Sequence, residues 1–177
     1  GDARIYTTDP AGQKLPTLAA VEKEIAAQEA ACLKPGNLLH VSRGVRARSA
    51  EGYFAPWFTQ YYYYAINGVT DDMGWYLSHT DKPSWLELTL PKEEKIGRLV
   101  LYSPNLKDYD LQLQAADGTI YTAEIRGNFE KVATHSFAAP IPALKVRVTA
   151  ISTREGTEPK RPQLSEIEAY AEPAGNV

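Results

Sequence analysis

Sulfur-containing residues and long apolar runs are nearly absent from this chain. Cys32 is the one cysteine, so no disulfide can form within the 177 residues, and a single domain of this size requires none for its core. No segment approaches the roughly eighteen apolar residues of a membrane-spanning helix. A basic surplus is also missing, because the net charge is −3, whereas nucleic-acid-binding domains carry clustered lysine and arginine. We expect a globular domain with no nucleic-acid partner and no membrane span.

Sequence motifs of catalysis are missing as well. There is no G-x-S-x-G, no H-E-x-x-H and no phosphate-binding loop. His40, His79 and His135 are scattered without the spacing of metal ligands. Asp71 and Asp72 are adjacent, and neighbouring carboxylates seldom face each other across a glycosidic bond. We therefore predict that the chain is not an enzyme.

An amphipathic helix is predicted near the start of the chain. Residues 17–33 are rich in alanine, glutamate and glutamine, and their apolar members fall on one face at helical spacing. Thr17 is a plausible N-cap, and Pro35-Gly36 ends the segment. Such a helix cannot bury its stripe alone, so it should dock on the following domain or on a neighbour. We assign residues 1–36 to linker and helix and read the chain, which begins at Gly1, as a piece of a longer protein.

After Asn37 the pattern changes to the alternation typical of strands. Asp117-Gly118 between two alternating segments predicts a hairpin. About nine short strands separated by turn signals indicate an all-β sandwich or barrel. The predicted strands are Leu38–Val41, Val45–Ser49, Trp85–Leu90, Gly97–Tyr102, Tyr109–Gln114, Thr119–Ile125, Lys131–Phe137, Leu144–Ile151 and Leu164–Tyr170.

The aromatic residues are concentrated in one window, residues 53–64, which holds eight of them. Phe54, Trp57, Phe58 and Tyr61 recur at helical spacing, which predicts a turn or two of helix with one face buried as a plug. Eight exposed rings would make a costly apolar patch, so most should be core. Tyr62 and Tyr63 lie off that face and should reach solvent, and Trp57 could serve either side. Of the other tryptophans, Trp75 is expected to be core rather than ligand-facing, and Trp85 is expected to be core.

An ordered series of short motifs resembles the discoidin, or factor V/VIII C-type, family. Ala65-Ile66-Asn67-Gly68 stands where the family has an A-x-D-G turn, and Trp75 follows near the family's tryptophan. The series then continues through Ser84-Trp85-Leu86-Glu87-Leu88, the hairpin at Asp117-Gly118, Val146-Arg147-Val148 and Glu166-Ile167-Glu168-Ala169-Tyr170. The resemblance covers roughly residues 37–171, leaving residues 172–177 as a tail. The cysteines that factor-type members carry at both ends of the domain are missing here.

The resemblance implies a jelly-roll β-sandwich of the galactose-binding-domain type, preceded here by a short N-terminal helix. It also implies a function, which is that of the bacterial galactose-binding carbohydrate-binding modules. We accordingly expect a non-catalytic module of a larger, secreted or cell-surface or periplasmic, glycan-processing protein. Its partners would be a glycan or polysaccharide and the neighbouring domains, and the chain itself would be a monomer. The alternative is a protein-interaction or interdomain packing module without sugar binding, which the alanine-rich helix favours.

In the galactose-binding members, apical loops hold the sugar with an aromatic ring, a histidine, an arginine and an asparagine. Aromatic planes match the apolar face of a sugar, and polar groups match its hydroxyls. The nearest equivalents here, and our predicted carbohydrate-binding residues, are Trp57, Tyr62, Tyr63, Tyr76, His79, Arg126, Asn128 and Phe129. For two of these residues another role is open: His79 could make local hydrogen bonds, and Arg126 could form a surface salt bridge to Glu124 or Glu130.

A structural calcium ion is the one cofactor that the resemblance suggests. Calcium takes six to eight oxygen ligands, and Asn67, Asp71, Asp72 and Glu166 could supply four side chains if the closing strand lies beside the Asn67 turn. The family's aspartate in this turn is replaced by Asn67. The alternative is an Asx-turn on Asn67 beside two solvated aspartates.

Overall fold

Antiparallel β-sheet dominates the fold, as predicted. The computed structural model describes residues 16–50, 61–76, 83–157 and 161–173. Its strands are β1 (Arg46–Ser49), β2 (Trp75–Tyr76), β3 (Ser84–Tyr102), β4 (Leu106–Gln114), β5 (Ile120–Ile125), β6 (Val132–Thr153), β7 (Gln163–Leu164) and β8 (Glu166–Tyr170). Its helices are α1 (Leu18–Ala31), a 3-10 turn η1 (Val41–Arg43) and α2 (Tyr61–Tyr64).

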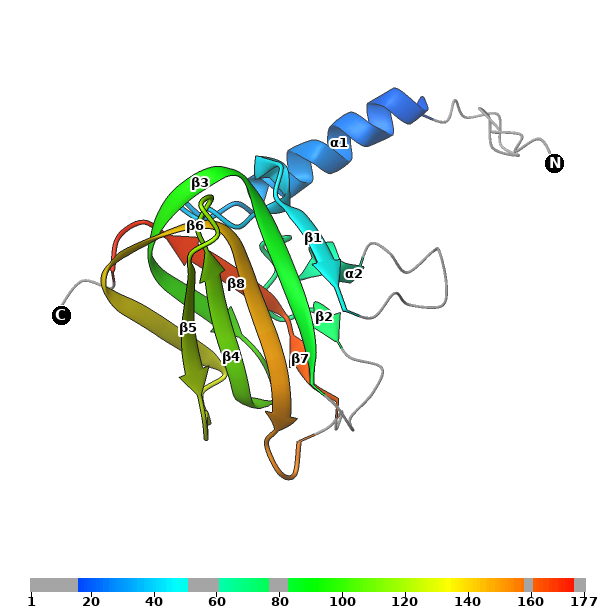
Figure 1. Cartoon of the computed structure of the whole chain (residues 1–177). Coiled ribbons are helices and arrows are strands. Elements are labelled where there is room, and N and C mark those ends of the chain that lie inside the picture. The colour runs from blue at the N-terminus through cyan, green and yellow to red at the C-terminus, as the bar shows by residue number, and fades with distance from the viewer. Residues whose placement is uncertain (1–15, 51–60, 77–82, 158–160, 174–177) are drawn as a thin grey trace.

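Two long bent strands, β3 and β6, contribute to both layers of the sandwich (Figure 1). The first half of β3 and the second half of β6 form one layer with β1, β4 and β5, in the order β1–β3–β6–β4–β5. The other halves form the second layer with β8. Pairing shifts register between Thr89 and Glu94, where β3 turns from one layer to the other.

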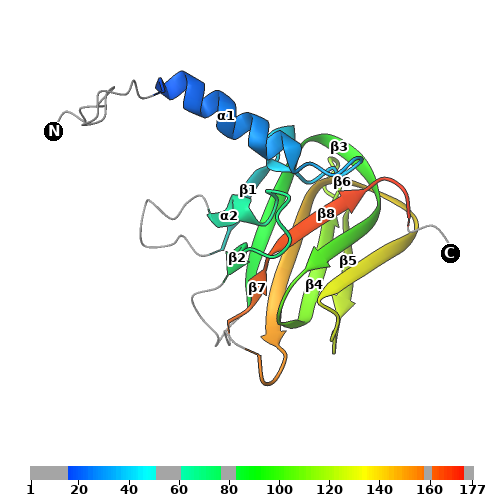
Figure 2. The ribbon, with the colours of Figure 1, turned by 180° about the vertical axis from the view of Figure 1, so that it is seen from behind.

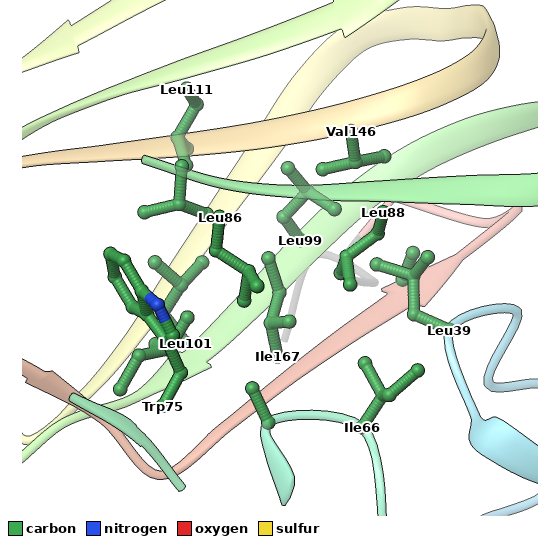
Figure 3. Close-up of a cluster of buried hydrophobic side chains, with 14 of the residues drawn as sticks. Leu39, Ile66, Trp75, Leu86, Leu88, Leu99, Leu101, Leu111, Val146 and Ile167 are labelled. Atoms are coloured by element: carbon green, nitrogen blue, oxygen red, sulfur yellow. The ribbon is translucent and has the colours of Figure 1, made fainter. Parts of the chain in front are cut away.

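Leucine-rich inward positions of both layers meet in a single core (Figure 3). Along β3, Leu86 and Leu88 are fully buried, as the alternation predicts. Trp75 is 2% exposed and donates from Nε1 to Ser49 Oγ at 3.3 Å, so its expected core position is confirmed. Trp85 is a correction: it is only half-buried, because it lies on the outward side of the same alternation.

The segment Leu38–Val41 is not a strand, contrary to prediction. Asn37 Oδ1 accepts from Leu39 N at 3.0 Å, which turns the backbone. His40 then caps η1, accepting from Ser42 N at 3.2 Å. A single backbone hydrogen bond, from Leu38 N to Ala169 O at 2.7 Å, joins this segment to β8.

Helix α1 begins at the predicted place, with Thr17 Oγ1 accepting from Ala20 N at 3.2 Å. None of its residues is buried, so it does not dock on the sandwich, and the other predicted contact, with a neighbour, stays a prediction. Leu18 and Ile25 are 60% and 50% exposed. The helix projects from the end of the sandwich where β3 bends (Figures 1 and 2). No helix among the described residues is long and apolar enough to cross a membrane.

Candidate functional site

A hydrogen-bonded loop, residues 126–131, joins β5 to β6 at the end of the sandwich opposite the 115–119 hairpin. Asn128 holds it from inside: Nδ2 donates to Leu106 O at 2.9 Å and Glu130 O at 3.1 Å, and Oδ1 accepts from Glu130 N at 3.2 Å. Gly127 N donates to Asp108 Oδ1 at 2.8 Å. The predicted binding residue Asn128 therefore shapes the loop with its own amide.

Asp108 is the anchor of this loop on β4. Ser152 Oγ donates to Asp108 Oδ2 at 2.5 Å, and the Gly127 N–H binds the other oxygen. These two hydrogen bonds lower the pKa of Asp108 below its ordinary value. The carboxylate therefore joins the loop to β4 and β6 through both of its oxygens.

Arg126 lies at the base of the loop and is ion-paired. Its Nη1 donates to Asp110 Oδ1 at 2.8 Å and to Tyr109 O at 3.1 Å. Nη2 lies 3.8 Å from Glu124 Oε2, which is one of the two partners expected for a surface salt bridge. The side chain is still 47% exposed, so it borders the solvent at this end.

Phe129 stands at the tip of the loop and is 78% exposed. Its carbonyl accepts from Arg154 Nη1 at 2.5 Å, so the backbone behind the ring is fixed although the ring is free of the core. An exposed aromatic ring on a braced loop is a surface that can stack on a flat apolar partner. Of the predicted binding residues whose side chains the structure describes, Phe129 is the most exposed.

Two residues that the sequence reasoning missed organise the neighbouring loops. Arg154 also donates from Nη2 to the carbonyls of Ser103 and Pro104. Asn105 is fully buried; its Nδ2 donates to Arg161 O at 2.6 Å and its Oδ1 accepts from Gln163 N at 3.0 Å. The turn residues Pro104-Asn105 hint at the loop, but nothing in the sequence indicates these partners.

The aromatic window is only partly within the described residues. Trp57 and His79 lie outside them, and of Tyr62 in α2 and Tyr76 in β2 only the backbone is described. Tyr63, expected to reach solvent, is half-buried and packs against the core. Its carbonyl accepts from Ile66 N at 3.0 Å, so the turn after α2 draws it inward. The next residue, Tyr64, is 42% exposed instead.

The turn at Asn67 brings together three of the four predicted metal ligands. Asn67 Nδ2 donates to Asp72 Oδ2 at 2.8 Å, and Asn67 Oδ1 accepts from Val69 N at 2.9 Å, which forms the Asx-turn given as the alternative to a bound ion. From β8, Glu166 Oε1 accepts from Gly68 N at 3.1 Å. Asp71 is exposed, and the structure does not join it to this cluster.

Glu166 is the most perturbed carboxyl of the cluster. It is fully buried, and its Oε2 has no hydrogen-bond partner. Burial raises the pKa of Glu166 from 4.5 to about 10. Burial also raises the pKa of Asp72. A buried carboxyl with an unpaired oxygen beside a half-buried carboxyl is a setting that a cation would stabilise.

The fit to calcium is partial. The side chains here offer two carboxylates, and among the described residues no group of three or more His, Cys, Asp or Glu side chains is placed to hold a metal. An ion at this turn would therefore take Asp72 and Glu166 and would need backbone carbonyls or water for its remaining ligands. The Asn67 oxygen is already engaged by Val69 N.

The chain belongs to the F5/8 type C domain family, whose model matches residues 49–166. This family is the discoidin family expected from the ordered motifs, and its jelly-roll sandwich is the fold observed. No curated protein sequence matches the chain.

Solved structures with the same fold include several bacterial modules. A family 32 carbohydrate-binding module from Streptococcus pneumoniae EndoD has a TM-score of 0.62 and 21% identity, covering 76% of this chain and 98% of that one. The family 32 module of Clostridium perfringens NanJ, solved with galactose, has a TM-score of 0.59 and 20% identity over 76% and 97%. A chitosan-binding module from a Paenibacillus chitosanase/glucanase, solved as a point mutant, has a TM-score of 0.60 and 19% identity over 76% and 98%.

Proposed function

We propose that this chain is a non-catalytic carbohydrate-binding module that holds a sugar at the loop end carrying Phe129. The observation that carries the proposal is the exposed ring of Phe129. The loop that bears it is held by hydrogen bonds from Arg154 to the Phe129 carbonyl and from Asn128 to the Leu106 carbonyl. A rigid platform loses little entropy on binding, and an aromatic plane matches the apolar face of a pyranose. Arg126, half-exposed at the base of the loop, would donate to sugar hydroxyls.

The similar structures support this chemistry. Two of them were solved in complex with galactose and with a GalNAc-β-1,3-galactose disaccharide. We propose that the chain binds sugars of this class, with an affinity of roughly 10 µM to 1 mM because few groups are engaged. Trp57, Tyr62, Tyr76 and His79 remain predicted carbohydrate-binding residues. The parent would be a secreted or cell-surface bacterial protein that processes glycans, and the module would raise the local concentration of its substrate.

The test is a glycan-binding measurement on Phe129→Ala by calorimetry, with galactose and GalNAc-β-1,3-galactose as probes. We expect binding to weaken about fivefold or more, because a ring stack is lost. Tyr121→Ala is the matched control, since Tyr121 is 40% exposed on β5 and lies away from the loop. Unchanged affinity in Phe129→Ala, or equal loss in the control, would contradict this site. Absence of binding to any glycan would overturn the function.

We also propose one structural calcium ion at the Asn67 turn, held by Asp72 and Glu166. The unpaired, buried Oε2 of Glu166 supports it. Calcium should raise the melting temperature of chelator-treated protein, and Glu166→Gln should abolish that rise. Asp71→Ala is the matched control, because Asp71 is exposed, and it should keep the rise. An unchanged melting temperature in wild type would count against the ion.

A second candidate function, interdomain packing, rests on α1. The helix and the turn after α2 border a groove of about 620 Å³. Ile25 and Cys32 line its helical side, and Tyr63, Tyr64 and Val69 line the other. Apolar surface of this kind is typical of a contact with a neighbouring domain. If this is the function, Ile25→Lys in the full parent protein should loosen the module and leave sugar binding intact, as limited proteolysis would report.

A further inference from the structure

Three cationic side chains, those of Arg48, Lys145 and Arg147, surround the Glu87 carboxylate on the outer face of the layer β1–β3–β6–β4–β5. Positions that alternate with the core leucines face outward, and pairing aligns them in rows across the strands. This face lies toward the viewer in Figure 1, with β8 and β2 behind it, and Figure 2 shows the reverse. One row is Arg48, Glu87, Arg147, Gln112 and Thr122, and the next is Arg46, Thr89, Lys145, Gln114 and Ile120.

Glu87 is the fixed centre of this cationic face. Its side chain is 5% exposed, and its two oxygens accept from Arg48 Nε at 2.8 Å and Arg147 Nη2 at 2.6 Å. Burial alone would raise the pKa of Glu87, but the hydrogen bonds from Arg147 and Arg48 outweigh it and lower the pKa below 4.5. One carboxylate cannot neutralise three cations, so positive charge remains here in a chain whose net charge is −3.

Trp85 and Glu87 together hold Arg147 in one orientation. The guanidinium carbon of Arg147 lies 4.2 Å from the centre of the Trp85 ring, and that of Arg48 lies 5.4 Å from it. Stacking on an aromatic face and pairing with a carboxylate fix a guanidinium before any ligand arrives. Among the described residues Arg147 Nη1 has no hydrogen-bond partner, so it remains available.

A small recess lies beside Arg147 on the same face. Its volume is about 90 Å³, well above the roughly 10–15 Å³ that one water needs. Lys145 Nζ stands 3.9 Å from Glu87 Oε1, beyond hydrogen-bond reach. Within the described part of the chain, the side chains of Gln112 and Gln114 also make no hydrogen bond. The recess is lined by Glu87, Gln112, Gln114, Ile120, Lys145 and Arg147.

We propose that this recess binds a carboxylate or sulfate group of an acidic glycan, as a second site separate from the Phe129 loop. Lys145 and Arg147 supply charge, and the two glutamine amides supply neutral donors, which is the set that an oxyanion needs. The recess lies near the 115–119 hairpin, whereas Phe129 lies beyond the opposite end of β5. The choice of a glycan over other polyanions rests on the proposed function.

Affinity gel electrophoresis of the whole chain tests the proposal. The probes are polygalacturonate for carboxylate, dextran sulfate for sulfate, neutral dextran, and polyglutamate as a polyanion that is not a glycan. Lys145→Gln and Gln114→Glu change the recess while keeping side-chain size. Lys92→Gln is the matched control, since it removes the same charge from a side chain that is 79% exposed outside the recess.

We expect at least one acidic polysaccharide, but neither neutral dextran nor polyglutamate, to retard wild type. Lys145→Gln and Gln114→Glu should each weaken that binding roughly threefold or more, and Lys92→Gln should not. Equal loss in Lys92→Gln, or equal binding of polyglutamate, would overturn the proposal. So would a loss caused by Phe129→Ala, which would assign acidic glycans to the loop end instead. Failure of neutral sugars to bind would contradict only the Phe129 site.

Discussion

Asn37 joins the start of the domain to its closing strand with a buried amide. The residue is 1% exposed. Its Oδ1 accepts from Leu39 N and from Ala169 N, both at 3.0 Å, and its Nδ2 donates to Leu39 O at 3.1 Å. Substitution by alanine removes all three hydrogen bonds and leaves their backbone partners inside the protein.

The expected cost follows from that count. A buried polar group that loses its partner costs about 1–3 kcal/mol, and two N–H groups and one carbonyl lose theirs, although the carbonyl has a second lone pair. We therefore expect Asn37→Ala to lower the free energy of unfolding by about 3 kcal/mol. At roughly 2–4 °C per kcal/mol for a domain of this size, the melting temperature should fall by roughly 6–12 °C.

Urea denaturation followed by tryptophan fluorescence measures this change. Gln114→Ala is the matched control, because it removes an amide from the outer face of β4, where surface changes usually stay within about 0.5 kcal/mol. The Phe129 loop is remote from Asn37, so sugar affinity of the folded variant should not change. A loss below about 1 kcal/mol in Asn37→Ala would refute the reasoning that its three hydrogen bonds hold β8 in place.

Three further outcomes are expected. With chelator present, burial of Glu166 raises its pKa from 4.5 to about 10, so stability should fall as pH rises between those values, by at most about 1.4 kcal/mol per pH unit. Glu166→Gln should flatten this slope in urea titrations from pH 5 to 8, and parallel slopes would contradict it. Gly74→Ala should destabilise by about 2 kcal/mol or more, since φ is +57° and a Cβ would strike the Leu164 carbonyl; an unchanged melting curve would refute this. Lys34→Met should lower the free energy of unfolding by about 1–2 kcal/mol, because Glu168, whose side chain is 3% exposed, loses the ammonium group 2.5 Å away. A decrease no larger than that in Lys23→Met would argue against this ion pair as a source of stability.

Local patterns predicted most of the secondary structure correctly. The Asp117-Gly118 hairpin, the Thr17 cap and the inward leucines of β3 each depend on neighbours within a few residues, which the sequence displays directly. The failures are of a different kind. Leu38–Val41 has the composition of a strand, yet the Leu39 N–H donates to the Asn37 side chain and not to a neighbouring strand. Trp85 is a residue type typical of a core, yet the alternation of its strand places it on the outer face, in contact with Arg48 and Arg147.

The candidate sites were only partly predictable, because their partners are distant in sequence. Phe129 and Asn128 were identified from residue type and loop position. The pairing of β4, β5 and β6 places Arg154, just after the end of β6, behind Phe129. The same pairing lets the Asn128 amide bind the backbone at Leu106. Asn67 and Glu166 were expected to be close only because the resemblance placed the last strand beside the turn. Asp71 was expected beside them as well, and it is a carboxylate of the right type, but its side chain is exposed.

The sequence by itself determined the all-β class of the fold and the helix cap, because alternation, caps and turns are local properties of the chain. Its resemblance to the discoidin family supplied the candidate sugar-binding residues. The tertiary structure alone decided which of these residues meet. Alternation sets the face of the sheet on which a side chain lies, but strand order sets its neighbours across that face. Only the order β1–β3–β6–β4–β5 places Arg48, Lys145 and Arg147 around Glu87, and only the contact of β8 with the Asn67 turn buries Glu166 beside Asp72.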